Sequence, residues 1–204
     1  LIALLCCVSA VFSLWTFQRN MLWADEFSLW QDCVKKSPDK ARPHNNLGLA
    51  FYDRGMMEEA VREYDRALQL DPTYILAVNN KGVALNAQGK STEAVHLYVE
   101  ALKRFPNSSE TYANLGAALM LLGRFDEAVD RYEKAIQLKP GNHEAYNSLG
   151  MAMARKGNMD KAVANYLQAL RINPYSTDAC INLGLAFANK GDIQGAVGYF
   201  SQAI

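Results

Sequence analysis

The sequence predicts an all-α protein in which pairs of antiparallel helices stack one after another, because five series of residues recur at the same 34-residue spacing. Glycine recurs every 34 residues in two series, at Gly48, Gly82, Gly116, Gly150 and Gly184 and at Gly55, Gly89, Gly123, Gly157 and Gly191. An alanine at 60, 94, 128, 162 and 196 keeps the same spacing, as does an aromatic residue at 64, 98, 132, 166 and 200. Proline follows at 72, 106, 140 and 174. Coincident series at one period indicate a repeated helical hairpin.

The copy from Glu110 to Pro140 explains the first helix of each hairpin. Tyr112, Leu115 and Leu119 recur at helical spacing and form one apolar stripe. Gly116 has no side chain, so the paired helix can approach closely there. Gly123 follows the stripe, where a left-handed residue can end the helix.

The second helix of the same copy begins with acidic residues and ends at a proline. Asp126 and Glu127 suit the first turn, where the helix dipole favours negative charge. Ala128, Tyr132 and Ala135 form the buried face, and a proline at 140 stops the helix. One hairpin cannot cover its own apolar surface, so neighbouring hairpins must stack on it.

These offsets match the 34-residue pattern of the tetratricopeptide repeat (TPR), a family that the chain resembles. The resemblance implies a TPR α-solenoid, a right-handed superhelix of helix hairpins. The predicted copies span residues 41–74, 75–108, 109–142, 143–176 and 177–204, the last of them truncated. The resemblance further implies that the first helices line a concave groove through positions 2, 5, 6, 9, 12 and 13 of each copy.

A membrane helix is predicted over residues 1–20, as the end of a longer membrane region. Residues 1–17 carry no charge, and Trp15, Phe17 and Trp23 cluster at the polar end of the segment. A full crossing takes roughly 20 apolar residues, with aromatic rings at the interface. The apolar core of a signal peptide and a buried helix are the alternatives. The chain reads as an excerpt of a longer protein.

Residues 21–40 are predicted to form a capping helix or half repeat. Trp30 lies 34 residues before Tyr64, and Cys33 lies 34 residues before Ala67. This spacing predicts a second helix without a first helix.

Composition and motifs exclude several kinds of function. Lys and Arg together number 21, as do Asp and Glu, so no net charge favours nucleic acid. The sequence lacks phosphate-binding, nucleophile-elbow and zinc-protease motifs. His44, His96 and His143 occupy unrelated repeat positions, and His44 falls at a packing position. We therefore predict no catalytic residue, metal or cofactor within this chain.

Asparagine at positions 5 and 6 of the repeat is the candidate site. Position 6 holds Asn46, Asn80, Asn114, Ser148 and Asn182, and position 5 adds Asn45, Asn79 and Asn147. An amide offers donors and an acceptor, so a row of amides can pair with the main chain of an extended peptide. The alternative is that these amides only join neighbouring helices. The lysine pattern that holds a C-terminal carboxylate in some TPR arrays is absent. Position 9 is apolar, at Leu49, Val83, Ala117, Met151 and Leu185.

Residues 1–50 resemble the junction between membrane helices and C-terminal repeats in the transmembrane and TPR-containing O-mannosyltransferases. Arg19-Asn20, Trp23, Leu29-Trp30 and Pro38 carry this resemblance. It implies repeats outside the cytoplasm, periplasmic or lumenal, although the cytoplasmic side stays open.

Two functions follow as hypotheses. The first is a membrane-tethered module, held by residues 1–17, that binds an extended peptide or a partner protein. The alternative is the substrate-recruiting tail of a polytopic lipid-linked-sugar glycosyltransferase, whose enzyme domain would lie upstream. End-to-end self-association of the truncated array is also expected.

Overall fold

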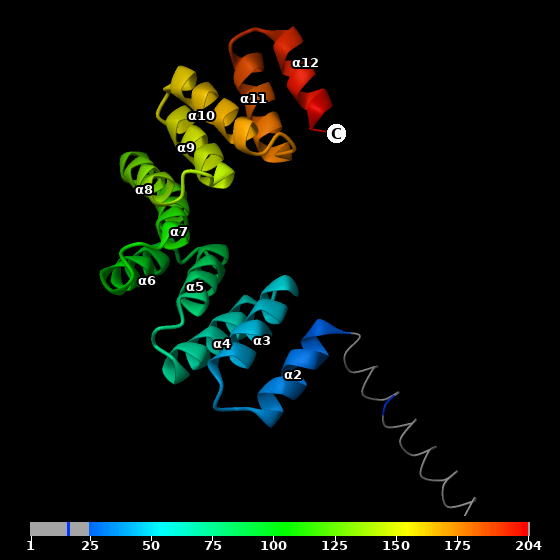
Figure 1. Cartoon of the computed structure of the whole chain (residues 1–204), viewed down its shortest axis with the longest axis vertical. Helices are drawn as coiled ribbons and strands as arrows, with labels where there is room; N and C mark the ends of the chain where they lie inside the picture. The colour runs from blue at the N-terminus through cyan, green and yellow to red at the C-terminus, as the bar shows by residue number, and fades with distance from the viewer. Residues whose placement is uncertain (1–15, 17–24, 204) are drawn as a thin grey trace, which may run out of the picture. The chain divides into compact units, whose positions relative to one another are not determined.

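The structure is a computed structural model that describes residue 16 and residues 25–203. The predicted membrane helix therefore lies outside the described residues, apart from Thr16. The described chain forms eleven helices and no strand (Figure 1). They are α2 (Glu26–Lys36), α3 (Ala41–Asp53), α4 (Met57–Leu70), α5 (Ile75–Ala87), α6 (Ser91–Arg104), α7 (Ser109–Leu121), α8 (Phe125–Leu138), α9 (His143–Arg155), α10 (Met159–Ile172), α11 (Thr177–Asn189) and α12 (Ile193–Gln202). Within this part of the chain, no helix has both the length and the apolar character that a bilayer crossing needs.

The helices belong to two compact units, one ending at Ala84 and the other beginning at Leu85. In the first unit α2 packs against α3, and α3 packs against α4. In the second unit each helix from α6 to α12 packs against the next one along the chain. The all-α hairpin architecture predicted from the 34-residue period is confirmed for the described residues.

Each first helix ends at a glycine in the left-handed region. The φ angles are 74° at Gly55, 76° at Gly89, 72° at Gly123, 81° at Gly157 and 81° at Gly191. L-residues with a side chain rarely adopt this conformation, which explains why glycine recurs here. The chain then turns directly into the second helix of the hairpin.

The other glycine series marks where the two helices of a hairpin meet. A Cβ atom added to Gly116 would lie 2.8 Å from Cε1 of Tyr132, and one added to Gly150 would lie 2.5 Å from Cε1 of Tyr166. These distances are shorter than van der Waals contact. The glycine therefore provides the space that the buried ring of the second helix fills.

Small residues flank each buried ring. Ala128, Tyr132 and Ala135 on α8 are all at least 97% buried, with relative exposures of 0%, 3% and 0%. Burial raises the pKa of Tyr132 and of Tyr166 to about 12. The tyrosines thus pack mainly as large apolar groups.

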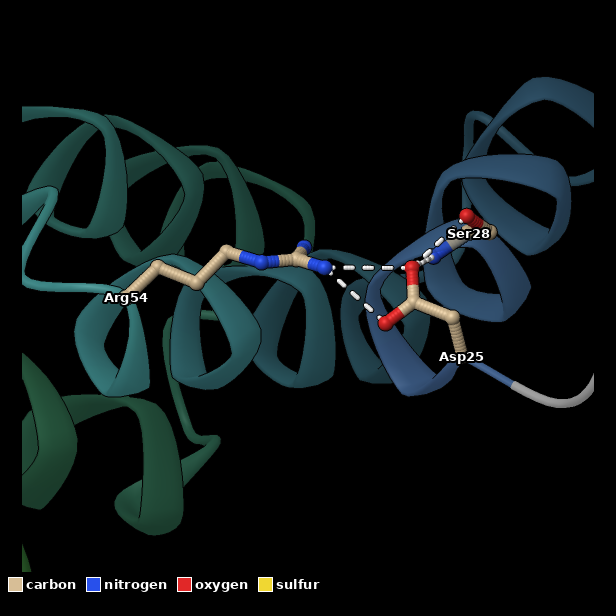
Figure 2. Close-up of polar contacts among 3 residues, drawn as sticks. All are labelled: Asp25, Ser28 and Arg54. Atoms are coloured by element: carbon tan, nitrogen blue, oxygen red, sulfur yellow. Dashed lines mark hydrogen bonds and ion pairs between the residues drawn. The ribbon is translucent and has the colours of Figure 1, made fainter.

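An ion pair joins α2 to the first hairpin (Figure 2). Asp25 caps α2 by accepting a 3.1 Å hydrogen bond from the backbone N–H of Ser28, and Arg54 donates to its Oδ1 at 2.9 Å. The hydrogen bonds from Ser28 and then Arg54 lower the pKa of Asp25. Arg54 also lies 3.8 Å above the ring of Phe27, whose ring meets Phe51 edge-on at 4.9 Å. An ion pair, a cation–π contact and aromatic packing thus hold α2 against α3.

His44 has a structural role in the first unit. Its side chain is buried, with Nδ1 2.6 Å from Oε2 of Glu63 on α4 and Nε2 2.9 Å from the carbonyl oxygen of Pro38. The imidazole therefore connects α3 to α4 and to the segment that precedes α3.

Candidate functional site

The predicted asparagines form hydrogen bonds between successive first helices. Nδ2 of Asn80 on α5 donates to Oδ1 of Asn45 on α3 at 3.0 Å. Nδ2 of Asn182 on α11 donates to Oδ1 of Asn147 on α9 at 2.9 Å. In both pairs the donor is a position 6 amide and the acceptor is the position 5 amide of the preceding copy. These bonds give the row a packing role.

Burial separates the two positions. The position 5 amides are enclosed, with exposures of 4% for Asn45, 2% for Asn79 and 9% for Asn147. The position 6 amides are half-buried and thus reachable: Asn46, Asn80, Asn114 and Asn182. An extended peptide could contact only the second group without displacing packed side chains.

A cavity of about 620 Å³ lies between α7 and α9 in the second unit. Its walls include Met120, Leu121 and Phe125, with Met151 and Arg155 contributed by α9. We call it the Leu121 cavity. Leu121 is 64% exposed, which is high for a leucine in a helix of a packed hairpin.

A second cavity of about 370 Å³ lies between α9 and α11. Its lining includes Met159, Asn182 and Leu185, and it shares Met151 and Arg155 with the Leu121 cavity. We call it the Leu185 cavity. Since two side chains line both cavities, the two form adjoining hollows on either side of α9.

A third cavity of about 340 Å³, the Asn114 cavity, is polar. Asn114, Glu110 and Glu144 line it, together with Lys139. Ser148 lines both this cavity and the Leu121 cavity, and its side chain hydrogen-bonds to Tyr132. The same unit therefore presents an acidic, amide-bearing hollow next to two apolar ones.

Apolar side chains, amides and charged groups line these three cavities. Among the residues that the structure describes, no group of three His, Cys, Asp or Glu side chains could hold a metal ion. The walls offer apolar contact from methionine and leucine, hydrogen bonds from half-buried amides, and one guanidinium, that of Arg155.

The three cavities include only part of the predicted site. Asn114 and Asn182 line them, whereas Asn45, Asn46, Asn79 and Asn80 belong to the first unit and Asn147 is enclosed behind Asn182. Sequence reasoning did not single out Leu121 and Arg155. Both stand at position 13 of their copies, which the TPR resemblance assigns to the groove, so the same 34-residue count could have found them.

Comparison with known sequences agrees with this architecture. A family described as Psidin, N-terminal TPR repeats region, matches residues 50–182, and one described as Tetratricopeptide repeat matches residues 182–204. A curated relative is Protein O-mannosyl-transferase F38B6.6 of Caenorhabditis elegans, 36% identical over 59 residues. That match covers 29% of this chain and 9% of the relative.

Solved structures give the same result. MamA is 28% identical with a TM-score of 0.64, over 77% of this chain and 92% of MamA. YrrB, a TPR protein whose structure is described as having an unusual peptide-binding site, is 24% identical with a TM-score of 0.58, over 86% of this chain and 90% of YrrB. With a TPR family match over more than half of its 204 residues, the chain belongs to the tetratricopeptide repeat family.

Proposed function

We propose that this chain is a protein-interaction module that binds an extended segment of a partner protein along α7, α9 and α11. The observation that carries the proposal is the pair of adjoining apolar cavities that share Met151 and Arg155. Exposed apolar side chains line both of them, with exposures of 64% for Leu121, 43% for Met151 and 52% for Leu185. Contiguous exposed apolar surface rimmed by polar groups is typical of an interaction site.

The fold likeness supports the same proposal. YrrB, which shares the fold, is described as having a peptide-binding site. In this chain, half-buried Asn182 lines the Leu185 cavity and half-buried Asn114 lines the neighbouring Asn114 cavity, where their amides would pair with the main chain of a bound segment. The apolar side chains of that segment would enter the cavities.

Replacing Leu121 or Leu185 with Asp tests this proposal. Peptides selected from a random twelve-residue library on the unmodified chain should lose at least about 10-fold in affinity for Leu121→Asp and Leu185→Asp, because a carboxylate replaces apolar contact. Val99→Asp is the matched control, since Val99 is 41% exposed on α6 and lines none of the three cavities. Equal affinity in all four proteins, measured by calorimetry, would exclude these cavities as the binding site.

We further propose that the module is tethered to a membrane through residues 1–17 and lies outside the cytoplasm. The uncharged sequence of that segment and the resemblance of residues 1–50 support this placement. The alternative function, a substrate-recruiting tail of a lipid-linked-sugar glycosyltransferase, is favoured by the 59-residue match to an O-mannosyl-transferase. Reading the complete frame upstream distinguishes the two, since a glycosyltransferase requires many further membrane spans there.

The side of the membrane can be tested at Asn107. The sequence Asn107-Ser108-Ser109 is an N-glycosylation acceptor, and Asn107 is exposed in the turn between α6 and α7. In the full-length protein expressed in insect cells, a lumenal repeat region should show a glycosidase-sensitive gel shift that Asn107→Gln removes. Asp160→Thr creates a second acceptor at exposed Asn158. Absence of a shift at both sites would contradict the lumenal placement.

We also propose that the chain self-associates through the apolar outer face of α12. Ile193 and Val197 on this helix are 65% and 58% exposed. The equivalent Val129 on α8 is 6% exposed.

A further inference from the structure

We propose that the bound segment carries an acidic side chain between two apolar side chains, and that Arg155 binds the acidic group. This inference rests on the proposed function, because it specifies the chemistry of the segment that occupies the same cavities.

Arg155 stands where such a segment must cross α9. The Leu121 cavity is formed by α7 and α8 on one side of α9, and the Leu185 cavity by α10 and α11 on the other. Arg155 and Met151 line both cavities. A segment whose apolar side chains fill both cavities therefore lies next to the guanidinium of Arg155 at the position between those two side chains.

The guanidinium is available for a partner. Lys156, the next residue, pairs with Asp126 at 2.5 Å, and Lys190 pairs with Asp160. Within residues 25–203, by contrast, no carboxylate forms an ion pair with Arg155, although its side chain is exposed. A guanidinium offers five N–H donors in a planar fork that matches a carboxylate. Apolar walls on both sides reduce the competition from water for that pair.

Negatively charged side chains line the Asn114 cavity, and they limit where the acidic group of the segment can bind. Glu110 and Glu144 line the Asn114 cavity, with Lys139 as the cation among its lining residues. Two carboxylates there disfavour an acidic side chain. Charge complementarity thus places the acidic group of the segment at Arg155 rather than at the Asn114 cavity.

The apolar walls discriminate less between bound side chains than the charge of Arg155 does. Met120, Met151 and Met159 contribute to the two apolar cavities. Methionine is unbranched and flexible, so such walls adapt to different apolar side chains. Selectivity is therefore expected at the acidic position, with several apolar residues accepted on either side.

A library of random twelve-residue peptides, displayed to the chain and to its Arg155→Gln variant, tests the proposal. The unmodified chain should enrich Asp or Glu flanked by apolar residues, and the variant should not. A selected peptide should bind at least about 10-fold more weakly when its acidic residue becomes the matching amide, because a charge-assisted hydrogen bond is lost. For Arg155→Gln the two peptides should bind within about 2-fold of each other. Arg171→Gln, an exposed arginine on α10 outside the cavities, is the matched control and should keep the preference.

The outcomes separate this inference from the proposed function. Selected peptides that lack acidic enrichment but lose affinity when Leu121 or Leu185 is replaced would contradict the role of Arg155. Such a result would still support binding at the two apolar cavities. Selection that yields no peptide, or peptides insensitive to both leucines, would overturn the proposed function itself. Circular dichroism of each variant checks that its helices are retained.

Discussion

Gly150 and Tyr166 show how single residues set the distance between the two helices of a hairpin. A Cβ atom on Gly150 would lie 2.5 Å from Cε1 and 2.6 Å from Cδ1 of Tyr166, and 3.1 Å from the carbonyl oxygen of Ala162. The ring has little freedom to move, since Tyr166 is 3% exposed. The same arrangement recurs at Gly116 and Tyr132. This contact explains why one glycine series and the aromatic series recur together.

Gly150→Ala is expected to lower the free energy of unfolding by about 1–3 kcal/mol, because overpacking outweighs the better helix propensity of alanine. Gly198→Ala is the matched control: this glycine lies within α12, and an added Cβ would meet nothing within 4 Å. The free energy of unfolding of this control should rise by up to about 1 kcal/mol. Urea denaturation, monitored by circular dichroism, measures the stability of both variants. Equal midpoints for the two variants would contradict the packing role of Gly150.

The buried phenols predict sensitivity to alkaline pH. Burial raises the pKa of Tyr166 to about 12, whereas an unfolded tyrosine titrates near ~10. Between these values the unfolded chain releases the proton and the folded chain retains it, so the free energy of unfolding falls as pH rises. Tyr166→Phe should reduce this loss of stability between pH ~10 and the folded pKa of about 12. Tyr175→Phe, at a side chain 92% exposed, should not reduce it.

At the scale of helices, asparagine pairs join one hairpin to the next. Asn182 on α11 donates to Asn147 on α9 at 2.9 Å, and Asn147 is 9% exposed. Asn80 on α5 and Asn45 on α3 repeat the pair in the first unit. The exposed ion pair of Lys190 with Asp160 joins α11 to α10 by a different contact. Both kinds of contact cross between hairpins, but only the amide pair is shielded from water.

A double-mutant cycle between Asn147→Ala and Asn182→Ala should give a coupling free energy of about 0.5–1.5 kcal/mol, as for a partly buried neutral hydrogen bond. The cycle between Lys190→Ala and Asp160→Ala should give a smaller value, because water screens an exposed pair. Coupling is measured from urea midpoints of the single and double variants. If the amide cycle gave no coupling, the row would have no packing role, and its half-buried members would serve the bound segment alone.

At the scale of the whole molecule, α12 presents an apolar outer face through which we expect the chain to associate. Val95 and Val129 on α6 and α8 are 8% and 6% exposed, while Val197 at the same repeat position is 58% exposed. We expect the chain to associate with rising concentration and Val197→Lys to weaken that association by about 10-fold or more, since apolar contact is replaced by charge. Val99→Lys, at a 41% exposed valine on α6, is the matched control. A strictly monomeric light-scattering profile at high concentration would contradict this expectation.

Much of the fold could be predicted because each feature depends on residues close in sequence. The turn after each first helix needs a left-handed residue, and Gly123 with a φ of 72° supplies it. The contact between Gly116 and Tyr132 spans 16 positions of one hairpin and recurs at Gly48, Gly150 and Gly184. Local requirements of this kind appear directly in a repeating pattern.

The candidate site could be predicted only in part. Repeat position assigned Asn114 and Asn182 to the groove side, and both line cavities. Repeat position also assigned Asn147, at position 5, to that side, but packing of α11 encloses it beneath Asn182. Whether an amide is reachable depends on the side chains that the next hairpin brings over it.

The sequence by itself determined the hairpin, its period and its helix ends, because glycine conformation and apolar spacing are properties of neighbouring residues. Only the tertiary structure decided that Met151 and Arg155 would stand between two cavities and that no carboxylate among the described residues would pair with Arg155. Cavities and ion pairs arise between helices from different repeats. Their existence depends on how closely those helices pack, which no single repeat encodes.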